Sequence, residues 1–243
     1  MTTQLHAACP IKFGEPNMEQ QSFRPRDAAF VNFTIRYRIG TNKAYGTQLL
    51  PDISLNAVAK VTARLCDMGL LTRLPLVLPE NYFRLGPKAV SVLGLSPRHC
   101  EPLGPQSLPV DYATLIYATQ SVTPKRRLSP LELSQYTPWL PEGLRASPYC
   151  VAGDGRLDLI RVDLGGSPQH VARKVAAAAN QRLSIPELAD LAGRSKFQIA
   201  VLTTSAQKAS YIAKALEIID CMDAIRIHLT VIPQLSLLLL RGK

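Results

Sequence analysis

Apolar residues recur at helical spacing in one segment of the first third of the chain. Val58, Val61 and Leu65 are three or four residues apart, so they can share one helix face and pack on a core. Ser54 is suited to the N-cap because its hydroxyl can accept a hydrogen bond from a free backbone N–H group. Gly69 is the residue type that most often follows a helix in the left-handed conformation. The pattern therefore predicts a helix between Ser54 and Gly69 with a polar opposite face.

The elements predicted around this helix follow a known order. Two helices are expected before it, over residues 25–40 and 43–50, and two extended runs follow it, over residues 70–74 and 82–85. Three helices followed by a two-stranded hairpin are the layout of a winged helix-turn-helix. Such a domain is therefore predicted over residues 25–96.

The polar face of the third helix carries the candidate DNA contacts. Asn56, Lys60 and Arg64 are four residues apart and share that face. In a winged helix-turn-helix this helix enters the major groove, where asparagine can bond adenine and basic side chains can reach guanine or phosphate. The predicted hairpin adds three candidates for backbone or minor-groove contacts: Arg73, Asn81 and Arg84. The alternative is a solvated helix face in a domain that contacts other proteins.

Two stretches outside this domain have a different character. Residues 1–24 are polar and lack a period, which predicts a flexible N-terminal tail. Prolines recur over residues 97–147, which predicts a connector with short helices. Trp139 lies between two prolines of this connector and is expected to anchor it by packing.

Predicted strands and helices alternate from residue 148 onward. A β-hairpin is expected around Asp154-Gly155, because this pair favours a tight turn between two apolar runs. Predicted helices over residues 168–183, 186–192 and 206–219 alternate with strands over residues 197–203 and 224–231, and the apolar run 235–240 is a candidate last edge strand. This series predicts a mixed sheet with helices packed against it over residues 148–243. The whole chain is therefore expected to be an α+β protein.

Composition narrows the partners that this fold is expected to have. The chain has 243 residues, of which 47% are apolar, and a net charge of +10, which favours a polyanionic partner such as nucleic acid. No apolar run approaches the ~18 residues of a membrane span. Five cysteines are scattered without metal-ligand spacing, and no signal peptide is evident. We therefore expect a cytoplasmic, nucleoid-associated protein that has no contact with membranes.

Three residues could support metal-dependent catalysis. Asp158 and Asp163 lie on one predicted strand, and Lys174 lies on the following helix. Carboxylates can hold Mg²⁺, with Asp163 as the candidate metal ligand, and a lysine can stabilise charge in a nuclease. The odd separation puts the two carboxylates on opposite strand faces unless a bulge intervenes. The alternative is an ion pair beside a DNA-binding surface that contains Arg161, His170 and Arg173.

Four short motifs resemble the replication-relaxation family of mobile elements, which includes MobC-type mobilisation relaxases. They span residues 56–71, 82–89, 159–166 and 201–205, within matching regions over 25–96 and 148–219. The resemblance implies a winged helix joined to an α/β restriction-endonuclease-like domain. It also implies double-stranded DNA as a partner, with a homodimer and mobilisation or replication proteins as further candidates.

The chain departs from the nuclease pattern of that family. An active domain would carry Pro-Asp on one strand, where this chain has Pro148-Tyr149, and Glu-x-Asp or Glu-x-Lys on the next, where it has Arg161-Val162-Asp163. We therefore expect a mobile-element DNA-binding protein whose nuclease-like domain assists binding or assembly without a cofactor. One alternative is a magnesium-dependent enzyme that nicks DNA, and another is a transcriptional regulator or a protein-interaction module.

Overall fold

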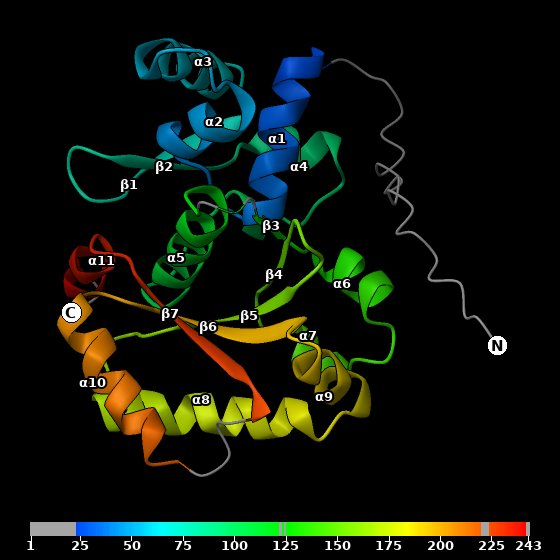
Figure 1. Ribbon diagram of the computed structural model, residues 1–243. Helices are drawn as coiled ribbons and strands as arrows, with labels where there is room; N and C mark the ends of the chain where they lie inside the picture. The colour runs from blue at the N-terminus through cyan, green and yellow to red at the C-terminus, as the bar shows by residue number, and fades with distance from the viewer. Residues whose placement is uncertain (1–22, 122, 124, 220–223, 242–243) are drawn as a thin grey trace.

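The computed structural model describes residues 23–121, 123, 125–219 and 224–241. These residues form an α+β protein with eleven α-helices, a mixed five-stranded sheet and a separate two-stranded antiparallel sheet. Figure 1 shows the first three helices and the small sheet at one end of the molecule, and the larger sheet nearer the other end.

The N-terminal elements match the predicted order of three helices and a hairpin. They are α1 (Pro25–Tyr37), α2 (Asn42–Leu49), α3 (Leu55–Asp67), β1 (Leu71–Pro75) and β2 (Asn81–Leu85). The Ser54 side chain accepts from the backbone N–H of Ala57, and Gly69 has a φ of +71°. Both predicted ends of the α3 helix are thereby confirmed.

A close backbone crossing fixes the base of the β1–β2 hairpin. The strands pair antiparallel, with Leu71 opposite Leu85. Gly86 follows β2, and a Cβ atom at this position would lie 2.1 Å from the carbonyl oxygen of Gly69. Only glycine fits there, so the chain can pass beneath the end of α3 before α4 (Pro87–Val92) and the 3₁₀ helix η1 (Pro97–His99).

The proline-rich stretch after residue 97 contributes both a core helix and a sheet strand. Its elements are α5 (Ser107–Thr119), β3 (Lys125–Arg127), α6 (Pro130–Tyr136) and α7 (Glu142–Arg145). The α5 helix buries most of its length, and β3 pairs antiparallel with the first strand of the predicted hairpin. Ser129 and Glu132 form a reciprocal capping box that starts α6.

Each strand and helix predicted between residues 148 and 231 is confirmed. These elements are β4 (Tyr149–Ala152), β5 (Leu157–Val162), α8 (Pro168–Leu183), α9 (Pro186–Gly193), β6 (Phe197–Thr203), α10 (Ala206–Glu217) and β7 (Arg226–Val231). The strand order is β3-β4-β5-β6-β7, in which β3, β4 and β5 pair antiparallel and β5, β6 and β7 pair parallel. The expected mixed sheet is therefore present.

The predicted edge strand over residues 235–240 is wrong, because this run forms the helix α11 (Leu235–Arg241). Leu235 and Leu238 are buried one helical turn apart, whereas Leu237 and Leu240 remain exposed. A run of consecutive leucines carries no alternation, so its period cannot distinguish a strand from a helix. The guanidinium of Arg241 donates to the carbonyl oxygens of Pro75 and Leu76 and ties α11 to the hairpin loop.

The two faces of the five-stranded sheet pack against different helices. Side chains alternate along β5, so Ile160 joins a core with α5 and α11, whereas Leu159 joins a core with α8 and α10. The first core continues into the N-terminal helices, where it includes Phe30 and Tyr45. In Figure 1, α5 lies between these helices and the sheet, while α8 and α10 cover the far side.

Within the part of the chain that the structure describes, none of the helices combines the length and the apolar character needed to cross a bilayer.

Candidate nucleic-acid interface

The α3 helix presents two of the predicted DNA-binding side chains to solvent. Asn56 and Lys60 are exposed, whereas Val58, Thr62 and Leu65 are buried on the opposite side. The helix lies at the end of the molecule farthest from α8 (Figure 1). Its outer face therefore carries an amide and an ammonium group on successive turns.

Arg64, the third predicted residue of this face, is held by an ion pair with a buried carboxylate. Its guanidinium donates to both carboxylate oxygens of Asp27, a residue of α1 that is 1% exposed. Hydrogen bonding to Asp27 raises the pKa of Arg64 above its ordinary value. Because its donors already serve Asp27, Arg64 fastens α3 to α1, and about a third of its side chain (34%) reaches solvent.

The three predicted hairpin residues have different environments. Arg73 is exposed, with its guanidinium 6.0 Å from the centroid of the Phe83 ring, and Asn81 is half-buried at the start of β2. Arg84 is 3% exposed and donates to the backbone oxygens of Arg98 and His99 at 2.7 and 3.0 Å. Burial lowers the pKa of Arg84. The structure therefore presents Arg73 to solvent but uses Arg84 to hold the η1 segment.

The basic residues predicted on the C-terminal part do not share a surface with α3. His170 and Arg173 are exposed on α8, which lies at the opposite end of the molecule (Figure 1). Arg161 is half-buried on β5, where burial and then the nearby charge of Arg182 lower its pKa. The nine predicted DNA-binding residues are thus spread over two ends of the molecule and its interior.

Asp158 and Asp163 belong to opposite faces of the sheet, as their odd separation predicts. Asp158 accepts from the hydroxyl of Tyr117 at 2.7 Å and from the guanidinium of Arg156 at 3.1 Å. Tyr117 lies on α5, and its pKa is raised, first by burial and then by the Asp158 charge. Asp158 therefore serves as the acceptor of a structural contact between α5 and β5.

Asp163 pairs with a lysine that the sequence did not single out. The Nζ atom of Lys208 lies 2.7 Å from Asp163 Oδ2, which also accepts from the hydroxyl of Thr203 at 2.8 Å. The backbone N–H of Gly165 donates to the other carboxylate oxygen. Lys174, the predicted partner, is exposed on α8.

The location of Lys208 explains this pairing. Val162 pairs with Leu202 in the parallel β5–β6 ladder, so the next residues, Asp163 and Thr203, end side by side. The α10 helix begins directly after β6 and carries Lys208 in its first turn. The sequence could have pointed to Lys208 if β6 had been recognised as the parallel neighbour of β5, because α10 follows β6 along the chain.

The candidate catalytic residues Asp158, Asp163 and Lys174 are not brought together. Over the described ranges, no group of three or more histidine, cysteine or acidic side chains is arranged to hold a metal ion. Comparison with models of protein families, with curated proteins and with solved structures gives no match to this chain.

Proposed function

We propose that residues 25–96 form a winged helix-turn-helix and that the protein binds double-stranded DNA through α3. The observation that carries the proposal is the two-sided character of this helix. It buries Val58 and Leu65 and presents Asn56 and Lys60 on a surface at one end of the molecule. An α-helix presented in this way fits the width of the major groove.

The packing of α2 behind α3 supports the helix-turn-helix assignment. The hydroxyl of Thr62, in the middle of α3, donates to the Asn42 side chain at the start of α2. Gly46 of α2 faces Leu55 and Val58 in the first turn of α3, where an added Cβ atom would make ordinary contacts of 3.5 and 3.7 Å. These contacts hold the inner side of α3 and leave its outer side open to a partner.

The charge around α3 supports a polyanionic partner. Exposed basic residues occur on three neighbouring elements: Lys43 on α2, Arg73 on β1 and Lys88 on α4. Arg73 lies beside Cys66 near the C-terminal end of α3, and Lys88 lies against Gly69, which follows that helix. Together with the net charge of +10, these side chains can replace counterions along DNA phosphates.

We further propose that residues 148–243 form an endonuclease-like domain that assists DNA binding or assembly in a mobile-element setting. The β4–β5 hairpin followed by the parallel strand β6, with α8 and α10 on one sheet face and α11 on the other, supports this comparison. Asp158 and Asp163 lie on opposite faces and are occupied by other partners, which favours the binding role over DNA nicking.

Selection from a random pool of double-stranded DNA tests the proposal. The full chain should enrich a defined sequence, and Asn56→Ala should lower discrimination at one base pair by about 1–3 kcal/mol. An inverted repeat in the enriched sequence would indicate binding as a homodimer. Lys214→Ala, on α10 far from α3, is the control and should leave the enriched sequence unchanged. Failure to enrich any duplex DNA would contradict the proposal.

A further inference from the structure

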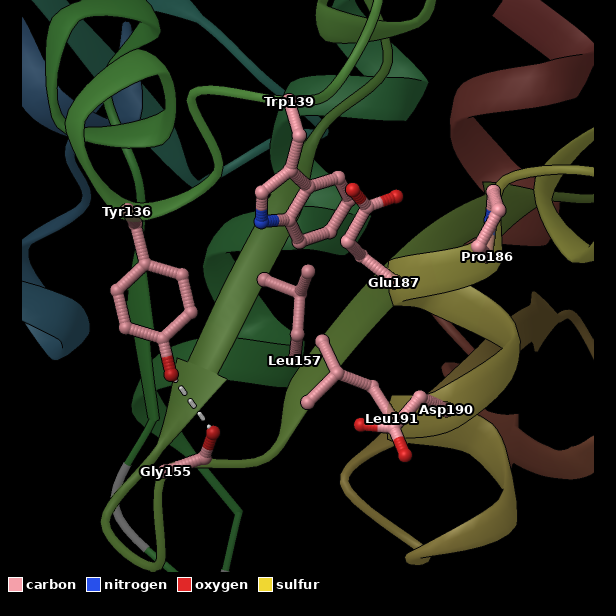
Figure 2. A pocket seen from close by; sticks show the side chains of 8 residues that line it. All are labelled: Tyr136, Trp139, Gly155, Leu157, Pro186, Glu187, Asp190 and Leu191. Atoms are coloured by element: carbon pink, nitrogen blue, oxygen red, sulfur yellow. Dashed lines mark hydrogen bonds between the residues drawn. The ribbon is translucent and has the colours of Figure 1, made fainter.

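A cavity of about 590 Å³ opens between the α6–α7 segment, the β4–β5 turn and α9. Its volume lies within the range of small-molecule sites. The residues that line it are Tyr136, Trp139, Gly155, Leu157, Pro186, Glu187, Asp190 and Leu191 (Figure 2). None of these residues belongs to the proposed DNA-binding surface.

Two aromatic rings and two leucines form the apolar wall of the cavity. Tyr136 donates its hydroxyl to the carbonyl oxygen of Gly155 at 2.9 Å, which fixes the ring in place (Figure 2). Trp139 is partly buried, and its indole ring extends into the cavity above Leu157 (Figure 2). A slender aliphatic chain can lie along this wall and be removed from water.

Two carboxylates complete the lining, and they have different partners. Glu187 and Asp190 are one turn apart on α9. Asp190 pairs with Arg194 at 2.9 Å. Glu187 has no ion pair with any residue that the structure describes, and its carboxylate points toward the Trp139 ring in Figure 2.

We propose that this cavity binds a primary alkylammonium ion carried on a slender aliphatic chain. The ammonium group lies between the Glu187 carboxylate and the face of Trp139, where an opposite charge and an aromatic quadrupole both favour a cation. The methylene groups lie against Trp139 and Leu157. The Glu187 carboxylate, which has no counterion among the described residues that line the cavity, disfavours a phosphate-bearing ligand at this site.

Titration of the full chain with cadaverine tests the site, with pentanediol as the uncharged ligand of the same length. Trp139 is the single tryptophan of the chain, so its fluorescence reports directly on the cavity. Cadaverine should give a saturable change and bind at least about tenfold more tightly than the diol, because only the ammonium gains the charge contacts. Calorimetry of the same titration records binding that leaves the fluorescence unchanged.

Glu187→Gln keeps the shape of the cavity and should weaken cadaverine binding about tenfold. Glu217→Gln removes an exposed carboxylate from α10 and is the matched control, which should bind as the parent does. Circular dichroism checks that both variants fold.

A lysine-containing tripeptide, titrated in parallel, distinguishes the two sources of an alkylammonium group. Tighter binding of the tripeptide identifies a protein-borne lysine as the occupant, and tighter binding of cadaverine identifies a free amine. Three outcomes would overturn the proposal: no saturable signal by either method, equal affinities for cadaverine and the diol, or unchanged affinity in Glu187→Gln.

Discussion

Replacement of Lys208 by methionine should destabilise the protein, because it leaves the Asp163 charge buried without its counterion. Removal of one partner of a buried ion pair costs about 3–5 kcal/mol. The hydroxyl of Thr203 and the N–H of Gly165 still donate to Asp163, and the Lys208 side chain is 21% exposed. These facts place the expected loss for Lys208→Met at the lower end, about 3 kcal/mol.

Replacement of Asp163, the other partner of this ion pair, should cost less. Asp163→Asn leaves a lysine whose ammonium can turn toward solvent, so a loss of about 1 kcal/mol is expected. The double variant Asp163→Asn/Lys208→Met buries no unpaired charge and should be more stable than Lys208→Met alone. A double-mutant cycle built from these three variants should therefore give a coupling free energy of about 2 kcal/mol between the two side chains.

Urea unfolding followed by Trp139 fluorescence and circular dichroism measures these losses. With a slope of about 3 kcal/mol per molar urea, Lys208→Met should lower the midpoint by about 1 M. Lys174→Met removes an exposed lysine of α8 and should change stability by less than about 0.5 kcal/mol. Equal losses in the two lysine variants, or a double variant as unstable as Lys208→Met, would refute the reasoning.

Two further predictions concern stability. Arg64→Ala leaves Asp27 buried and unpaired and should cost about 2 kcal/mol in urea unfolding, a value reduced because the Arg64 side chain is partly exposed. Lys60→Ala should cost less than about 0.5 kcal/mol. Similar losses in the two variants would contradict the ion-pair role of Arg64. Burial raises the pKa of Tyr37 and Tyr112 to about 12. The unfolded chain therefore releases the two tyrosine protons at lower pH than the folded protein does. The stabilisation from these tyrosines is fully present below about pH 10 and is lost as the pH rises toward 12, by up to about 1.4 kcal/mol per pH unit for each tyrosine. Urea midpoints that stay unchanged between about pH 9 and about pH 11 would contradict this prediction.

Elements with local signals at their ends could be predicted from the sequence. Ser54 and Gly69 mark the two ends of α3, and the pair Asp154-Gly155 marks the turn between β4 and β5. In each case one or two neighbouring residues determine the backbone conformation. The leucine run of α11 has no such signal, and its helical state depends on packing against α5.

The candidate site was predictable only where a side chain has no distant partner. Asn56 and Lys60 lie exposed on the polar helix face that their spacing predicts. Arg64 shares that spacing, yet its guanidinium is held by Asp27, which is 37 positions away in the chain. Burial does not alternate along β2, which is buried over most of its length, so Arg84 is buried as well. Its guanidinium donates to the backbone of the η1 segment. Such long-range contacts leave no periodic trace in the sequence.

The affinity for random-sequence double-stranded DNA as a function of salt concentration tests the DNA-binding proposal most directly. The logarithm of the binding constant should fall linearly with the logarithm of the salt concentration. Lys60→Ala should weaken binding and reduce the slope by about 1, as expected for one lost phosphate contact, whereas Lys214→Ala on α10 should retain the parent slope. Affinity that is independent of salt, or the same change in both lysine variants, would contradict binding through α3.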